Sequence, residues 1–288
     1  MHLPGQEVFY RIHRNDRAPS RRLLLLHGGG VDGRITWSGI LPYLVNWNEI
    51  LVPDLRGTGK TRFPDRGEHA FAAEEVLEDI RALLKHLDWC EFDLGGYSYG
   101  GLIAMLFRAG HPVASVDNRS ADKTYLLEPA LFGEMNGESA SNHELILRAA
   151  RRLRQAEHVE EGLEMFLDAV APNRTRGSKN EAVMRGRLSH RPAGLSYTIE
   201  CVFDAGKRFD RTVLIAAQSN VSSFSGARSH PQIHAFCGKT AASRVDWSCH
   251  LIQGADHALP FQQPLQIAQL MNRDFSGCPM NLSSSVPL

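Results

Sequence analysis

The stretch from Asp93 to Gly101, Asp-Leu-Gly-Gly-Tyr-Ser-Tyr-Gly-Gly, constrains the fold of this chain more than any other. It lies between a strand-like segment and an apolar, helix-patterned run from Leu102 to Phe107. Gly96 and Gly100 bracket Ser98 in the pattern G-x-S-x-G, which is typical of a tight strand-to-helix turn that presents a serine hydroxyl. The pattern predicts a nucleophilic serine, although an ordinary glycine-rich loop carries the same signature.

Strand-like and helix-like segments alternate along most of the chain. Continuous apolar runs indicate buried strands, and apolar residues at helical spacing indicate amphipathic helices. The predicted strands are residues 8–12, 22–26, 49–54, 91–94, 124–127, 211–217 and 248–253, and the predicted helices include residues 37–44, 72–87 and 264–272. Repeated alternation with short turns predicts an α/β fold with a doubly wound, mostly parallel sheet and helices on both faces.

The alternation stops between Leu131 and Asp210, where four helical patterns follow one another at residues 145–153, 159–170, 181–188 and 194–203. Helices inserted between two sheet strands are typical of a lid over the strand ends, although surface helices without a role in substrate access also fit. We predict a core in two parts, residues 1–130 and 211–275, a helical cap over residues 131–210, and a flexible tail over residues 276–288.

Composition limits the partners of the chain. Its 288 residues carry 32 basic and 32 acidic side chains, a balance that favours a small-molecule substrate over nucleic acid or an anionic membrane. No apolar run approaches the roughly 18 residues of a membrane span. The five cysteines are widely spread without a C-x-x-C pair, which predicts no disulfide framework and a cytoplasmic location. The sequence gives no indication of oligomeric state.

A second glycine pattern competes with the serine turn. Gly28-x-Gly30-x-x-Gly33 follows a predicted strand, and Asp54 ends the next strand, which together satisfy the spacing of a dinucleotide-binding fingerprint. This interpretation would leave the turn at Ser98 without a purpose. We therefore weigh it well below the serine hypothesis.

Metal binding has a weaker signal. His230-x-x-x-His234 and the nearby Cys237 supply metal-ligating atoms, but they lack the full ligand set and the acidic partner of a zinc site. No metal and no cofactor is predicted.

A histidine near the C-terminal end complements the serine. His257 lies in a loop just after the last predicted strand. Because the carboxyl ends of parallel strands share one edge of a sheet, we expect Ser98 and His257 to meet there. A histidine that accepts the serine proton makes the hydroxyl nucleophilic.

Taken together, these motifs resemble the α/β-hydrolases with a helical cap. The matching segments are His27-Gly28-Gly29-Gly30, Asp54-x-Arg56-Gly57-x-Gly59, Gly96-Tyr97-Ser98-Tyr99-Gly100-Gly101, His111-Pro112 and Gly254-Ala255-Asp256-His257. The resemblance implies Ser98 as nucleophile, His257 as general base and an oxyanion hole formed by the backbone amides of Gly29 and Tyr99. It also assigns the glycines after His27 to the acyl pocket and so argues against a dinucleotide site.

The third member of the triad departs from the family pattern. The family usually carries an aspartate after the strand that follows the cap, where this sequence places Asn220 after the predicted strand 211–217. Glu128, at the end of the predicted strand 124–127, is a possible substitute from a neighbouring strand. The prediction is a serine hydrolase for a small ester, thioester or related acyl substrate. A small-molecule binder or receptor of the same fold, or a carbon–carbon bond hydrolase or lyase, remains the alternative.

Overall fold

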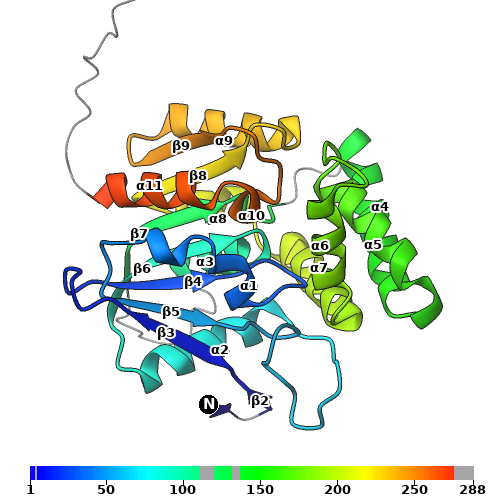
Figure 1. The fold of residues 1–288 in the computed structure, drawn as a ribbon, viewed down its shortest axis with the longest axis horizontal. Helices are drawn as coiled ribbons and strands as arrows, with labels where there is room; N and C mark the ends of the chain where they lie inside the picture. The colour runs from blue at the N-terminus through cyan, green and yellow to red at the C-terminus, as the bar shows by residue number, and fades with distance from the viewer. Residues whose placement is uncertain (4, 111–119, 132–136, 276–288) are drawn as a thin grey trace, which may run out of the picture.

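The computed structural model describes residues 1–3, 5–110, 120–131 and 137–275, and its centre is a seven-stranded sheet of order β3-β5-β4-β6-β7-β8-β9 (Figure 1). Its strands are β3 (Tyr10–Arg14), β4 (Arg22–Leu26), β5 (Glu49–Pro53), β6 (Glu91–Tyr97), β7 (Ser120–Leu127), β8 (Val221–Gly226) and β9 (Trp247–Ile252). Only the edge pair β3–β5 is antiparallel among these neighbours. A short antiparallel pair, β1 (His2–Leu3) and β2 (Gln6–Glu7), precedes the sheet. The predicted α/β architecture is confirmed.

Helices cover both faces of the sheet, and β4 shows why. Leu24 and Leu26 pack into the hydrophobic cluster on one face, whereas Leu23 and Leu25 pack into the cluster on the other. The first cluster is covered by α2 (Ala73–His86), α3 (Tyr99–Arg108), α8 (Arg211–Ala216) and α9 (Pro231–Ser243), and the second by α1 (Gly33–Trp37), the 3₁₀ turn η1 (Leu41–Tyr43), α10 (Leu259–Gln262) and α11 (Pro264–Phe275). Complete burial of one leucine side chain is worth about 1.5–3 kcal/mol, so the alternating strand stabilises both layers.

Of the five described α-helices between β7 and β8, the first four lie together on one side of the molecule and form the insertion (Figure 1), whereas α8 covers the sheet. The helices of the insertion are α4 (Gly137–Leu153), α5 (Val159–Val170), α6 (Lys179–Leu188) and α7 (Pro192–Arg208), with a 3₁₀ turn η2 (Ala156–His158) between the first two. The apolar residues of the insertion, among them Leu163 and Leu195, form one cluster together with Val31 of the sheet domain. The buried guanidinium of Arg191, just before α7, donates to the Glu68 carboxylate and to the Thr61 carbonyl. The insertion is therefore fastened to the sheet domain.

Two predicted elements are wrong. Residues 211–216 form helix α8 and not a strand, because the Asp210 carboxylate caps the amides of Thr212 and Val213. The strand after the insertion is instead β8. Its sequence, Val-Ser-Ser-Phe-Ser-Gly, contains no continuous apolar run, which is the pattern that we used to predict buried strands. The single helix predicted over residues 37–44 is also absent, since the chain forms α1 before it and η1, with Pro42 inside, within it.

The cysteines also depart from the prediction. Cys237 on α9 and Cys249 on β9 form a disulfide, while Cys90 and Cys201 are free. The partners are 12 residues apart, and they meet because β9 returns beside β8 under α9. The cysteine argument for a reducing compartment therefore no longer holds, and a cytoplasmic location stays a prediction.

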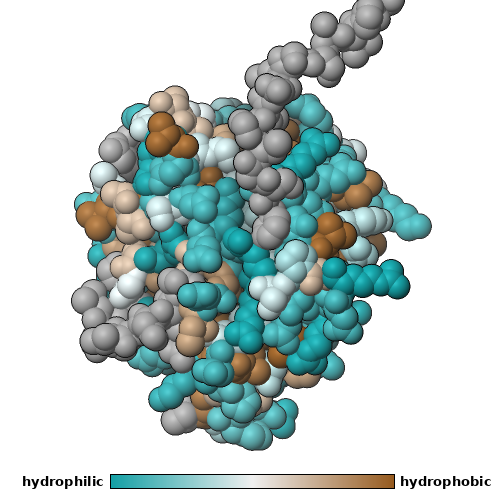
Figure 2. All heavy atoms as spheres, turned by 90° about the vertical axis from the view of Figure 1, so that its left-hand side faces the viewer, coloured by the Kyte–Doolittle hydropathy of each residue, from teal (hydrophilic) through white to brown (hydrophobic). Residues whose placement is uncertain are grey.

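Some predictions fall outside the described residues, namely the motif His111-Pro112 and the tail over residues 276–288. In the described ranges, no helix combines the length and apolar character needed to cross a membrane. Figure 2 shows a face of the molecule that is mostly hydrophilic with scattered apolar side chains.

Candidate active site

The serine turn joins β6 directly to α3. Ser98 adopts φ 51° and ψ −115°, a strained conformation for a non-glycine residue at the tip of the turn. Its backbone is fixed on both sides, because the Ser98 amide donates to the Leu127 carbonyl at 2.9 Å and the Ser98 carbonyl accepts from the Ala130 amide at 2.9 Å. The side chain is thereby held above the carboxyl end of the sheet, as the G-x-S-x-G pattern predicts.

The two bracketing glycines are required by close backbone contacts. A Cβ atom on Gly96 would lie 2.4 Å from the Gly100 carbonyl oxygen, and one on Gly100 would lie 2.4 Å from the Leu26 carbonyl oxygen. The Gly100 amide also donates to the His27 carbonyl at 3.0 Å, which ties the turn to the end of β4. An alanine at either glycine would push the serine out of place.

The imidazole of His257 lies beside the serine hydroxyl. The distance from His257 Nε2 to Ser98 Oγ is 3.1 Å. The loop that carries the histidine is fixed by the buried Asp256 carboxylate, which accepts from the Ala258 amide at 2.9 Å, and by the Tyr97 hydroxyl, which donates to the His257 carbonyl at 2.9 Å. Burial, and then the charge of Glu128, raises the pKa of the Tyr97 phenol, so Tyr97 remains a donor.

Glu128 lies on the other side of the imidazole. One carboxylate oxygen, Oε2, is 2.7 Å from His257 Nδ1, and the other, Oε1, accepts from the Gly226 amide at 2.7 Å and from the Ser229 hydroxyl. The side chain is completely buried, and the backbone adopts φ 41° directly after β7. The structure therefore brings Ser98, His257 and Glu128 into one hydrogen-bonded row.

Asn220 is not part of this row. It lies before the first residue of β8, whereas Gly226 at the other end of that strand contacts Glu128. Six strand residues span about 20 Å, so the two ends lie on opposite edges of the sheet. The exposed Asn220 side chain donates to the Asp122 carbonyl at 2.9 Å. The prediction that Asn220 is a partner of His257 followed from the wrong strand prediction and is itself wrong.

A cavity of about 1100 Å³ opens over the row and reaches beneath the insertion. Ser98, His257 and Glu128 line it, as do Gly29 and Tyr99, the two residues expected to stabilise an oxyanion. Tyr99 is the first residue of α3, where backbone amides have no partner within the helix. The inserted helices contribute an apolar wall of Ile146, Phe166, Leu167, Leu188, Leu195 and Ile199.

In the dinucleotide-like pattern, Asp54 stabilises the loops around it and is not available to a ligand. The Asp54 carboxylate accepts from the Gly33 amide at 3.0 Å and from the Lys60 amide at 2.9 Å, and so closes two loops of the chain upon each other. The acid that would bind a ribose is thus committed to backbone amides.

His27, beside these loops, is fully buried and provides a pH-dependent contribution to stability. Its Nδ1 lies 2.7 Å from the Gly28 carbonyl, which only accepts, and its Nε2 accepts from the Leu55 amide at 2.8 Å. This pattern requires the neutral imidazole, and burial lowers the pKa of His27. In the unfolded chain the group titrates near pH 6.5, so below about pH 6.5 the unfolded state binds a proton that the folded state does not.

We predict that the free energy of unfolding falls with acidification below about pH 6.5, and that His27 contributes up to about 1.4 kcal/mol per pH unit. Urea unfolding at several pH values would show a shallower slope for His27→Gln than for the wild type. The exposed His86 offers a matched control, since His86→Gln should keep the wild-type slope. Equal slopes for wild type and His27→Gln would contradict the prediction.

The histidines and the cysteine of the metal hypothesis have other partners. His234 Nε2 bonds the Gly226 carbonyl, His230 Nδ1 accepts from the Gln232 amide, and Cys237 is in the disulfide. Within the part of the chain that the structure describes, no group of three or more histidine, cysteine or acidic side chains is placed to hold a metal ion.

The mostly parallel seven-stranded sheet and the row Ser98–His257–Glu128 at its carboxyl edge agree with the family that the sequence matches. The chain belongs to the alpha/beta hydrolase family, whose model matches residues 23–270.

Curated relatives match over a shorter stretch. The proline iminopeptidase of Lactobacillus crispatus (strain ST1) is 31% identical over 118 residues, which cover 39% of each protein. The soluble epoxide hydrolase of Corynebacterium sp. (strain C12) is 28% identical over 120 residues, which cover 41% of this chain and 38% of that enzyme. The chain thus spans about two fifths of the length of these relatives.

Solved structures match over nearly the whole chain. A structure from a study of carboxylesterases of Nitrososphaera gargenis superposes with a TM-score of 0.72 at 18% identity and covers 94% of both chains. The enol-lactonase of Burkholderia xenovorans LB400 superposes with a TM-score of 0.70 at 18% identity, covering 94% of this chain and 97% of that one. At such identities the likeness concerns the fold alone.

The sequence analysis overlooked Gly226 and Ser229, the two residues that donate hydrogen bonds to the Glu128 carboxylate. The incorrect strand prediction placed them outside the site. The polar strand Val-Ser-Ser-Phe-Ser-Gly has a period-two alternation only in part, and no acidic residue follows it to mark a triad member.

Proposed function

We propose that this protein is a serine hydrolase that cleaves small esters, thioesters or related acyl substrates through an acyl-enzyme on Ser98. The observation that carries the proposal is the row from Ser98 Oγ to His257 Nε2, at 3.1 Å, and from His257 Nδ1 to Glu128 Oε2, at 2.7 Å. Nucleophile and base lie within hydrogen-bond reach, and the base is oriented by a buried carboxylate, which is the geometry of a serine triad.

In the proposed reaction, Ser98 Oγ attacks the acyl carbon while His257 Nε2 accepts its proton. The amides of Gly29 and Tyr99 stabilise the negative oxygen of the tetrahedral intermediate. The bond to the leaving group then breaks, and His257 returns the proton to the departing oxygen or sulfur. Water, deprotonated by His257, attacks the acyl-enzyme in the second half, and Ser98 recovers its proton as the acid is released.

The cavity supports a substrate with an apolar acyl group and no ammonium group. Among the described residues that line it, Glu128 is the only carboxylate, and both of its oxygens already accept hydrogen bonds. A substrate with a free amine would find no counter-charge there, and an unpaired buried ammonium is costly. This argues for an esterase over an aminopeptidase, although relatives include proline iminopeptidases. The inserted helices act in this proposal as a cap that sets acyl-group preference.

Labelling with a fluorophosphonate probe tests the nucleophile. The wild-type protein should be labelled, and Ser98→Ala should not, because the probe phosphonylates only an activated serine. Ser243→Ala provides a control for a hydroxyl that lines the same cavity and bonds the Thr240 carbonyl instead of the row, and it should retain labelling. Equal labelling of wild type and Ser98→Ala would refute the assignment of Ser98.

Small-molecule binding without turnover, and carbon–carbon bond cleavage, are the alternatives that this experiment leaves. A panel of p-nitrophenyl esters separates them from ester hydrolysis. Steady release of p-nitrophenol after an initial burst supports the proposal. A ligand that raises the melting temperature while no ester is consumed supports a binding role instead.

A further inference from the structure

The carboxylate of Glu128 is held by a turn of the chain that follows β8. The turn comprises residues 226–229, and it contacts Glu128 Oε1 at both ends, through the amide of Gly226 and the hydroxyl of Ser229. The Ser229 amide donates to the Gly226 carbonyl at 3.0 Å and closes the turn. The orientation of Oε2 toward His257 therefore depends on how firmly this turn is held.

Turn 226–229 packs closely against the loop that carries His257. A Cβ atom on Gly226 would lie 2.6 Å from the carbonyl oxygens of Ala255 and Asp256, so Gly226 packs directly against the residues that precede His257. The Arg228 amide donates to the Ala255 carbonyl at 2.8 Å. As a glycine, however, Gly226 has no side chain to restrict its own rotation. Its two flanking peptide groups must be fixed by hydrogen bonds.

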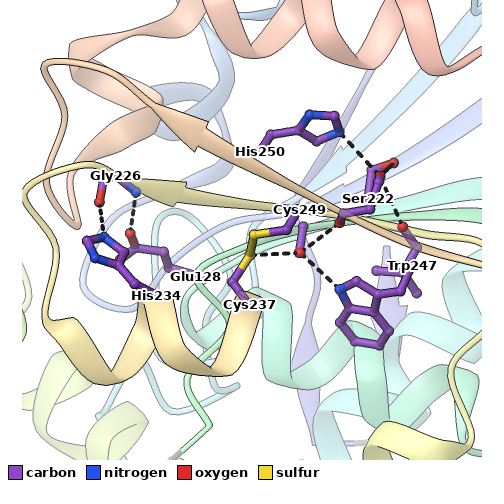
Figure 3. Close-up of a disulfide and its surroundings, with 11 residues drawn as sticks. Glu128, Ser222, Gly226, His234, Cys237, Trp247, Cys249 and His250 are labelled. Atoms are coloured by element: carbon purple, nitrogen blue, oxygen red, sulfur yellow. Dashed lines mark hydrogen bonds between the residues drawn. A yellow bond between two sulfur atoms is a disulfide. The ribbon is translucent and has the colours of Figure 1, made fainter. Parts of the chain in front are cut away.

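His234, on α9, supplies a hydrogen bond from the opposite side. Its Nε2 lies 2.7 Å from the Gly226 carbonyl oxygen, and because a carbonyl only accepts, Nε2 carries the proton and donates. Figure 3 shows His234 and Glu128 bonded to the two backbone polar groups of the same residue, Gly226. Gly226 is thus held at its carbonyl by His234 and at its amide by Glu128.

Helix α9 is itself anchored one turn beyond His234. Cys237 forms the disulfide with Cys249 on β9 (Figure 3). The Ser223 hydroxyl lies 3.1 Å from the Cys237 sulfur. The Trp247 indole donates to the same hydroxyl at 2.9 Å. The histidine therefore projects from a helix that is covalently tied to the sheet, which makes it a firm support for the turn.

We propose that His234 is a positioning residue of the hydrolytic site: by fixing the Gly226 carbonyl it holds turn 226–229, and through that turn it orients Glu128 toward His257. This inference rests on the proposed function for its effect on turnover. Its effect on the Glu128–His257 hydrogen bond does not require a substrate.

The test compares His234→Phe, which keeps a ring but removes the donor, with His234→Gln, which keeps an amide donor. We expect His234→Phe to lower kcat for a p-nitrophenyl ester about tenfold with little change in KM, since the lost hydrogen bond acts on the acid and not on substrate contacts. His234→Gln should recover most of the loss. His234→Leu serves as a second donor-free variant if His234→Phe does not fold.

A proton spectrum gives the readout that a purely structural role would not change. The proton between His257 Nδ1 and Glu128 should resonate far downfield in the wild type, and it should shift or broaden in His234→Phe and return in His234→Gln. His250→Phe is the matched control, because it makes the same substitution on β9, where the imidazole contacts Ser248 and Asp274 and not the turn. It should lower stability and leave the resonance in place.

The outcomes separate this inference from the proposed function. A folded His234→Phe variant with wild-type kcat and an unchanged resonance would overturn it, and so would a His234→Gln variant as impaired as His234→Phe. If the wild type hydrolyses no ester and labelling does not depend on Ser98, the proposed function fails. The resonance would still report whether His234 orients Glu128.

Discussion

A His257→Ala variant should fold normally and lose nearly all ester hydrolysis, with kcat falling roughly 10⁶-fold, the scale observed when the histidine of a serine triad is removed. Without the imidazole, the Ser98 hydroxyl has no acceptor for its proton and the leaving group has no donor. The fold should survive because the loop is held by its backbone and by Asp256, and not by the imidazole.

Steady-state kinetics with a p-nitrophenyl ester, together with circular dichroism, would check this result. The double variant Ser98→Ala with His257→Ala should be no worse than either single variant, because residues that act as one unit are not additive. Activity of His257→Ala within tenfold of the wild type would contradict its role as general base.

The second large effect concerns the acid. Glu128→Gln should lower kcat by about 10⁴-fold, as replacement of the acid by an amide does in a serine triad. The amide still accepts from the Gly226 amide and the Ser229 hydroxyl, so the turn should remain in place. It carries no charge to stabilise the imidazolium that forms when Ser98 gives up its proton.

Asn220 provides the control for this experiment. Asn220→Ala should leave kcat within about twofold, because its side chain bonds the Asp122 carbonyl at the opposite edge of the sheet. For the same reason, Asn220→Asp should not rescue Glu128→Gln. The assignment of Glu128 would fail if Glu128→Gln kept kcat within tenfold of the wild type, or if Asn220→Asp restored a Glu128→Gln variant.

Local patterns were sufficient to predict the serine turn. The two glycines around Ser98 are required by close contacts with residues of the turn itself and with the end of β4. The short motif therefore contains most of what is needed to predict the conformation of the turn. The meeting of Ser98 and His257 also follows from strand direction, since both residues come after parallel strands. The α/β architecture and these two positions could therefore be expected before the structure was known.

The residue proposed as the acid was harder to predict, because its place beside His257 depends on the pairing of strands. The apolar run Val213–Leu214–Ile215 satisfies a strand criterion, yet the cap at Asp210 makes it a helix, and Val213 is exposed while Leu214 is buried. This error placed the end of the strand that follows the insertion at residue 217, whereas β8 ends at Gly226. Asn220 therefore became a candidate for the third member of the triad. Likewise, the Cys237–Cys249 disulfide depends on how α9 lies over β9, and no spacing rule for cysteines contains that information.

The position of Glu128 has a consequence for how such a protein can diversify. Strands β6 and β7 are neighbours in register, with Tyr97 opposite Leu127, so Ser98 and Glu128 follow paired residues at the same edge. Both precede the inserted helices in the chain. The spacing between Ser98 and Glu128 is therefore set by one pair of strands and is independent of the length or path of the insertion. Under the proposed function, exchange or remodelling of the inserted helices leaves that spacing unchanged, so that substrate preference would evolve separately from the proposed nucleophile and acid.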